Sequence, residues 1–175
     1  MQIRYAGRED VTAITDIYNT GITSGTGTFD TALRRHRDIA AWLQADDLYP
    51  VLVAEMAGRV VGFARLFEYR PRDCYKGIAE FSIYLAEDAQ GQGVGTKLLG
   101  ELLVAAKAWG FHKVLSRIFT FNAASRALCK KLGFREVGVY ERHGQLNGKW
   151  LDVVIVEYLV PGIRAPEKVS LQSQT

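Results

Sequence analysis

Hydrophobic and polar residues alternate most regularly over residues 78–87, IAEFSIYLAE. Successive side chains of a β-strand point to opposite faces, so Phe81, Ile83 and Leu85 share one apolar face. The opposite face carries Glu80, Ser82 and Tyr84. The pattern predicts a central strand that rests on the core with one face and presents polar groups on the other.

Apolar residues recur at helical spacing in four segments, which predicts four helices. Two lie at residues 8–22 and 32–47, and a third begins directly after a glycine-rich stretch. The apolar stripe of this third helix consists of Val94, Leu98, Leu99, Leu102 and Ala106. The fourth helix, residues 122–134, is short and is ended by Gly133, because helix C-termini favour glycine.

Shorter apolar runs bounded by turn residues predict the remaining strands. They are residues 2–6, residues 111–119, a hairpin over 49–69 that turns at Ala57-Gly58, and a long hairpin over 135–160 that turns at Asn147-Gly148. Helices and strands are mixed along the chain. We therefore expect a single α/β domain over residues 1–160, with a mixed, mostly antiparallel sheet, and a polar C-terminal tail over residues 161–175.

Composition and charge narrow the class of protein. Of 175 residues, 48% are apolar and 23% charged, which is typical of a globular domain with a substantial core. The apolar runs are too short to span a bilayer, and the first ten residues lack the apolar centre of a secretion signal. The net charge of +3 comes without the Lys/Arg cluster of a nucleic-acid binder. We expect a cytoplasmic protein that binds neither membranes nor nucleic acid.

The cysteines and histidines indicate no metal site. Cys74 and Cys129 lie far apart in the sequence, and the three histidines are scattered, so no metal-ligand spacing is matched. Two free thiols fit a reducing cytoplasm.

Three glycines, Gly91, Gly93 and Gly95, stand where the third helix opens, although glycine disfavours helix formation. A helix N-terminus preceded by glycines offers free backbone N–H groups to a phosphate. The stretch is therefore either a pyrophosphate site or a plain glycine-rich connection. Two common phosphate motifs do not match, because Thr96-Lys97 reverses the order of a P-loop and Thr96 stands where a dinucleotide fold has its third glycine.

The segment QGQGVG, Gln90–Gly95, resembles the Gln/Arg-x-x-Gly-x-Gly/Ala signature of the GCN5-related N-acetyltransferases, the GNAT family. The segment FNAASRALCKKLGF, residues 121–134, is similar to another segment of that family. The resemblance implies the GNAT acyl-CoA N-acyltransferase fold. It also implies acetyl-CoA as cofactor, with its pyrophosphate on the loop amides and its pantetheine arm along a bulged strand, SIYL. The cofactor-binding residues that it implies are Ile83, Tyr84, Leu85, Gln90, Gly91, Gln92, Gly93, Val94, Gly95, Thr96, Asn122 and Ser125.

Further stretches make the resemblance closer to the phosphinothricin, methionine sulfoximine and arsinothricin N-acetyltransferases. They run from about Ile3 to Leu159 and include TFD, RPRDCY, AEFSIYL, LGFREVG and GKWLDV. The resemblance implies acetyl transfer to the α-amino group of a glutamate-like antimetabolite, a resistance activity, in a homodimer. Two alternatives stay open: acetylation of another small amine or a protein N-terminus, and a non-catalytic acyl-CoA sensor.

Glu80 lies on the polar face of the central strand, where the family has its catalytic glutamate. An α-amine is mostly protonated at neutral pH and must lose a proton before it attacks a thioester. The resemblance implies that Glu80 takes this proton, directly or through water, or orients the ammonium by its charge. Many members have a Tyr or His acid where this chain has Cys129, a residue type that is more typical of a small buried hydrophobe. The group that protonates the leaving thiolate is therefore open.

The loop segment RPRDCY places Arg70 and Arg72 two residues apart beside Tyr75. Relatives use basic residues and a tyrosine here against acidic groups of the substrate. A planar guanidinium suits a carboxylate or a phosphinate. The alternative is an exposed loop with solvated arginines. The resemblance also implies three further substrate-binding residues: Phe29, Glu80 and Ser82.

Overall fold

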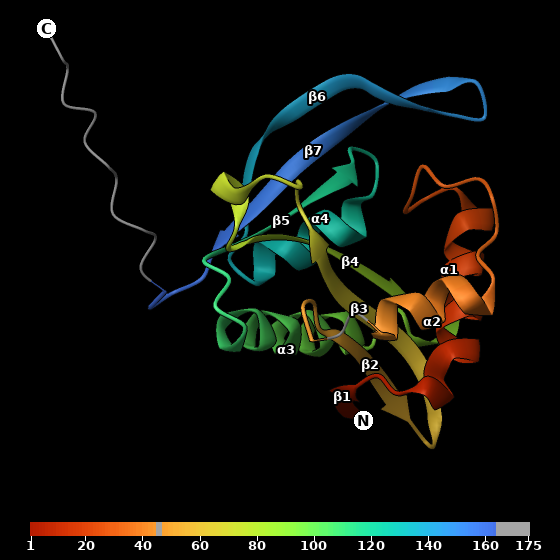
Figure 1. The fold of residues 1–175 in the computed structure, drawn as a ribbon. Helices are drawn as coiled ribbons and strands as arrows, with labels where there is room; N and C mark the ends of the chain where they lie inside the picture. Colours follow the sequence, from red (N-terminus) through yellow and green to blue (C-terminus); the bar gives the residue numbers. More distant parts are fainter. Residues whose placement is uncertain (45–46, 164–175) are drawn as a thin grey trace, which may run out of the picture.

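The computed structural model describes residues 1–44 and 47–163. Its seven strands form one sheet in the order β1-β2-β3-β4-β5-β7-β6 (Figure 1). The strands are β1 (Gln2–Tyr5), β2 (Val51–Met56), β3 (Arg59–Glu68), β4 (Ile78–Leu85), β5 (Lys113–Phe119), β6 (Arg135–Leu146) and β7 (Lys149–Leu159). Only β4 and β5 run parallel. The predicted mixed, mostly antiparallel sheet is confirmed.

Helices cover both faces of this sheet (Figure 1). The α-helices of the described residues are α1 (Val11–Ser24), α2 (His36–Gln44), α3 (Val94–Ala108) and α4 (Ala123–Lys131). Residues of α3 pack with those of β2, β3, β4, β5 and β7 in one apolar cluster, and α1 and α2 pack on the opposite face of β2 and β3 in another. The predicted apolar stripe of α3 is confirmed, since every member is at most 1% exposed. None of the helices in the described ranges is long and apolar enough to cross a membrane.

The helix predicted over residues 32–47 is shorter in the structure, because α2 begins only at His36. Asn19 of α1 explains the difference: its Nδ2 donates to the Arg34 carbonyl at 3.1 Å and its Oδ1 accepts from the Arg34 N–H at 2.8 Å. Both backbone groups of Arg34 are thus bound outside a helix. The Asp38 carboxylate then accepts from the Arg35 N–H at 2.9 Å, at the start of α2.

The two predicted hairpins are confirmed. Ala57 and Gly58 have φ values of 49° and 73°, and Asn147 and Gly148 have 49° and 77°, as two-residue turns of type I′ require. The β6–β7 hairpin is long and arches toward the loop after α1 (Figure 1). The hairpin contacts this loop at Gly144 of β6, which packs so closely on the Phe29 ring that an added Cβ would lie only 2.8 Å from it. Most of the predicted tail, from residue 164 on, lies outside the described residues.

Candidate active site

The sheet opens between its two parallel strands. β4 and β5 pair only at Ile78–Lys113, Ala79–Val114 and Glu80–Leu115. Beyond this point β4 continues on β3 and β5 continues on β7. The pairing of β4 with β3 is regular up to Leu85, so the bulge expected in SIYL is not seen against β3. The opening arises instead because β5 diverges, which leaves the β5-facing edge of β4 without a partner strand.

A cavity of about 1200 Å³ occupies this opening. Its walls come from α1 and the loop after it, from α2, β3, β4 and β5, from the N-terminal end of α3, from α4 and from β6. The glycine-rich stretch lies at one side, which we call the donor side. The other side, the acceptor chamber, is lined by Trp42, Arg65, Phe67, Glu80, Ser82 and Arg117.

Backbone geometry explains the glycines on the donor side. Gly91 and Gly93 have φ values of 72° and 78°, in the left-handed region that other residues rarely adopt. Gly93 is the N-cap of α3, and no side chain caps this helix. Gly95 serves packing, since a Cβ there would lie 3.3 Å from Leu128 and 3.5 Å from Leu85. The first-turn amides of α3 therefore face the cavity without a capping side chain, which fits a pyrophosphate.

Most of the predicted cofactor-binding residues line this one cavity. They are Ile83, Tyr84, Leu85, Gln90, Gly91, Gly93, Gly95, Thr96, Asn122 and Ser125. The side chains of Gln92 and Val94 point elsewhere, because Gln92 Nε2 donates to the Asp88 carbonyl at 2.5 Å and Val94 is buried in the core. Direct contact of each residue with acetyl-CoA stays a prediction.

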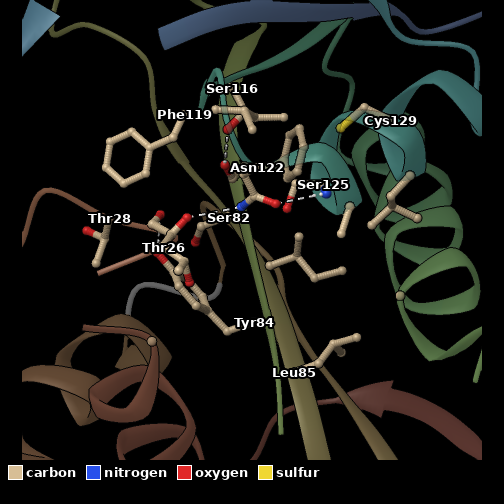
Figure 2. A pocket seen from close by; sticks show the side chains of 18 of the residues that line it. Thr26, Thr28, Ser82, Tyr84, Leu85, Ser116, Phe119, Asn122, Ser125 and Cys129 are labelled. Atoms are coloured by element: carbon tan, nitrogen blue, oxygen red, sulfur yellow. Dashed lines mark hydrogen bonds between the residues drawn. The ribbon is translucent and has the colours of Figure 1, made fainter. Parts of the chain in front are cut away.

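Asn122 connects two walls of the cavity, the loop after α1 and the start of α4 (Figure 2). Its Oδ1 accepts from the Ser125 N–H at 3.1 Å, which caps α4, and its Nδ2 donates to the Thr26 carbonyl at 3.1 Å. One amide side chain thus anchors the loop after α1 to the N-terminus of α4. Close by, Ser116 Oγ donates to the Phe81 carbonyl at 3.0 Å, where β4 and β5 part.

Glu80 lies where the sheet opens and is only 5% exposed. Its carboxylate accepts from Arg117 Nη2 at 2.9 Å and 3.1 Å, the two distances being those to Oε2 and Oε1. A buried carboxylate needs such a partner. The predicted catalytic carboxylate is thus held in place by a residue that sequence analysis did not select.

Arg117 and Arg65 are the two cations of the acceptor chamber, and sequence analysis missed both. Arg117 interrupts the apolar strand KVLSRIF, and Arg65 interrupts VVGFARLF. Charged residues within otherwise apolar strands are uncommon without a partner. This interruption is the signal in the sequence that identifies them.

The predicted substrate-binding residues divide into two groups. Phe29 and Ser82 line the cavity, and the Phe29 ring packs edge-on against Phe119 at 4.8 Å between centroids. Arg70, Arg72 and Tyr75 do not line it. The loop arginines are exposed and lie over tyrosine rings, Arg70 over Tyr69 at 5.3 Å and Arg72 over Tyr75 at 5.9 Å. Their contact with a substrate stays a prediction.

Cys129 lines the cavity but belongs to the core, with 2% of its surface exposed. Burial raises the pKa of its thiol to about 12. A thiol this weakly acidic is a poor proton donor to a thiolate with an ordinary pKa of about 8.5. The structure therefore favours a packing role for Cys129. In the described part of the chain, no three His, Cys, Asp or Glu side chains cluster in a way that holds a metal ion.

Comparison with known proteins agrees with this geometry. The family model described as the acetyltransferase (GNAT) family matches residues 13–134. The L-methionine sulfoximine/L-methionine sulfone acetyltransferase of Pseudomonas aeruginosa is 35% identical over 158 residues, which cover 89% of this chain and 92% of that protein. Phosphinothricin N-acetyltransferase of Alcaligenes faecalis is also 35% identical, over 89% of this chain and 80% of that protein.

A solved structure of an acetyltransferase has a similar fold over most of this chain. The structure of yncA from Salmonella typhimurium, determined with its cofactor acetyl-CoA, has a TM-score of 0.91 and 34% identity over 95% of this chain and 98% of that chain. Acetyl-CoA, the acetyl donor predicted from the sequence, is thus the ligand of a close structural neighbour. The family, the fold and the transferase class predicted from the sequence are confirmed, and the chain belongs to the acetyltransferase (GNAT) family.

Proposed function

We propose that this enzyme transfers the acetyl group of acetyl-CoA to the α-amino group of a glutamate-like amino acid of the phosphinothricin, methionine sulfoximine or arsinothricin class, and so detoxifies it. The names of the relatives at 35% identity support this acceptor class. One observation carries the proposal for this chain. The buried carboxylate of Glu80, paired with the half-exposed Arg117, lies in a cavity that also holds a helix N-terminus without a capping side chain.

The chemistry follows from these positions. The amine nitrogen forms a bond to the acetyl carbon, and the bond from that carbon to sulfur breaks. The nitrogen must lose a proton, and the carboxylate of Glu80 accepts it directly or through water. The departing thiolate takes up one proton. Since burial makes Cys129 a poor acid, we propose that water in the open cavity supplies this proton.

The donor side holds acetyl-CoA by its main chain in this proposal. Amides from Gly93 to Thr96 at the start of α3 bind the pyrophosphate. The unpaired edge of β4, from Ser82 to Leu85, forms backbone hydrogen bonds with the amides of the pantetheine arm, as it would with a neighbouring strand. The thioester then enters the opening beside Glu80.

The alternative acceptors fit the chamber less well. A polyamine carries only positive charges, and the chamber presents two arginines against one carboxylate. A sensor without activity has no need of a buried carboxylate at the opening. The homodimer and the cytoplasmic location expected from the sequence stay predictions.

The experiment is an acetyl-CoA consumption assay on the purified protein across a panel of amines. We expect turnover with phosphinothricin, methionine sulfoximine, methionine sulfone or arsinothricin, and little with spermidine or a peptide N-terminus. Turnover confined to spermidine or the peptide contradicts the acceptor class. Tight acetyl-CoA binding without turnover of any amine supports the sensor instead.

A further inference from the structure

Arg65 is a cation in the wall of the acceptor chamber, and no carboxylate of residues 1–44 and 47–163 forms an ion pair with it. Its guanidinium carbon lies 3.7 Å from the centroid of the Trp42 ring and 4.7 Å from that of Phe67. Its Nε is buried and has no hydrogen-bond partner among residues 1–44 and 47–163. A buried donor without an acceptor is unfavourable, and native structures leave few of them. The chamber therefore holds a buried positive charge and a buried N–H donor, and neither has a partner among the described residues.

The surroundings of Arg65 do not supply the missing anion. Burial lowers the pKa of its guanidinium to about 10, so the group is desolvated yet still charged at neutral pH. Asp30 is a carboxylate whose charge acts on Arg65. That carboxylate already accepts from the Tyr18 hydroxyl at 2.6 Å and from Arg34 Nη2 at 2.7 Å. The anion that completes the site must come from a ligand.

Strand order places the two arginines on opposite sides of β4, one on β3 and the other on β5. Arg65 lies directly opposite Ser82 in the β3–β4 pairing. On the other side, Glu80 pairs with Leu115 of the parallel strand β5. Arg117 lies two residues beyond Leu115, so it points to the same face as Leu115, just past the last paired position of β4 and β5. The two cations thus approach β4 from opposite sides, Arg65 beside Ser82 and Arg117 on the Glu80 carboxylate.

The two arginines differ in what they already bind. Arg117 contacts the Glu80 carboxylate through Nη2 and keeps 48% of its side chain exposed. Together Glu80 and Arg117 are complementary to the ammonium and the carboxylate of an α-amino acid. A glutamate-like acceptor has one further anionic group, on its side chain, and Arg65 is the cation left without a partner.

We propose that Arg65 binds the anionic side group of the acceptor and so sets the preference for acceptors with a charged side group over those with a neutral one. This inference rests on the proposed function, since it specifies the acceptor of the same site. The Trp42 and Phe67 rings exclude water from the guanidinium, which strengthens its interaction with an anion. The planar fork of the guanidinium suits a phosphinate or a carboxylate in two-point contact.

The test compares two acceptors that differ in the charge of the side group. Phosphinothricin carries an anionic phosphinate, whereas the sulfone of methionine sulfone is neutral. Arg65→Met keeps an unbranched side chain between the rings and removes the charge. We expect KM to rise about tenfold or more for phosphinothricin relative to methionine sulfone, because a charged hydrogen bond is lost only with the former. The KM of acetyl-CoA stays unchanged.

Two further variants control this result. Arg65→Lys keeps the charge without the planar fork, so it restores phosphinothricin binding only in part. Arg37→Met removes an arginine of α2 whose side chain is 74% exposed, and it leaves all KM values unchanged. A role in packing alone would raise KM equally for both acceptors.

Three outcomes overturn the inference. Equal KM changes for both acceptors in Arg65→Met show that Arg65 does not bind the side group, while the proposed function stands. A larger phosphinothricin-specific change in Arg72→Met than in Arg65→Met assigns this role to the exposed loop instead. If the wild-type enzyme acetylates neither acceptor, the proposed function and this inference fall together.

Discussion

The donor side and the acceptor chamber of the cavity are built from different parts of the polypeptide. The donor side consists of main chain: the left-handed Gly93, the uncapped start of α3 and the unpaired edge of β4. The acceptor chamber consists of side chains from separate elements, with Arg65 from β3 and Arg117 from β5 on either side of β4. A main-chain site depends on local backbone geometry, whereas the chamber depends on which side chains the fold brings together.

This difference has a consequence for the family. If the proposed function holds, substitutions in the chamber change the charge and shape that meet the acceptor without altering the backbone that meets the donor. One acetyl-CoA site is therefore compatible with many acceptors. The following variants test whether the two sides are separable in this chain.

Glu80→Gln is expected to have the largest effect. The glutamine amide keeps the shape of the side chain and still accepts a hydrogen bond from Arg117 Nη2, but it carries no negative charge and cannot act as a base. We expect kcat to fall about 10²- to 10⁴-fold, the usual contribution of a general base, with the acetyl-CoA KM nearly unchanged. Steady-state kinetics measure both values. Glu101→Gln, an exposed position on α3, is the matched control, and a kcat of Glu80→Gln within twofold of wild type removes Glu80 from the mechanism.

Gly93→Val tests the donor side alone. A branched residue at a φ of 78° strains the loop, and its side chain enters space that is open above the start of α3. We expect the Kd of acetyl-CoA to rise about tenfold or more in calorimetric titration, because the pyrophosphate loses amide contacts. Gly100→Ala lies within α3 in open space and leaves this Kd unchanged. An unchanged Kd in folded Gly93→Val contradicts the assignment of the loop.

Asn122 tests the connection between the loop after α1 and the start of α4. Asn122→Ala removes both of its hydrogen bonds, and loss of the N-cap lowers the free energy of unfolding by about 1 kcal/mol. Asn122→Asp keeps the cap on the Ser125 N–H but no longer donates to the Thr26 carbonyl. We expect Asn122→Asp to retain the wild-type melting temperature. The KM of acetyl-CoA and the KM of the acceptor should both rise a few-fold. If it loses as much stability as Asn122→Ala, the cap is not the stabilising contact.

Cys129→Ala is expected to have the smallest effect on catalysis. Since the thiol is a weaker acid than the leaving group, kcat stays within about twofold of wild type. A large fall in kcat at unchanged stability assigns Cys129 as the proton donor.

The raised pKa of Cys129 also predicts a pH effect on stability. The thiol ionises near its ordinary value of 9.0 when the chain is unfolded and near 12 when it is folded. Between pH 9 and 12 the folded state therefore binds more protons than the unfolded state. The protonated thiol of Cys129 contributes fully to the free energy of unfolding below pH 9, and this contribution is lost as the pH rises toward 12. Thermal melts from pH 8 to 10 should show a shallower loss for Cys129→Ala than for wild type.

Short-range patterns were enough to predict the parts of the molecule that depend on neighbouring residues. The alternation over residues 78–87 predicted that Phe81, Ile83 and Leu85 pack on the core cluster that contains α3, and that Glu80, Ser82 and Tyr84 lie on the opposite face, because a strand has a period of two. The glycines predicted the loop before α3, since a positive φ is a property of single residues.

Only the tertiary structure decided which distant residues meet. Arg117 reaches Glu80 across 37 positions of sequence, and Asn122 reaches Thr26 across 96. The same holds for α2, whose start was predicted too early because Asn19, on another helix, binds the backbone of Arg34. Periodicity reports the face on which a side chain lies, but its partner depends on strand order and register, which long-range pairing sets.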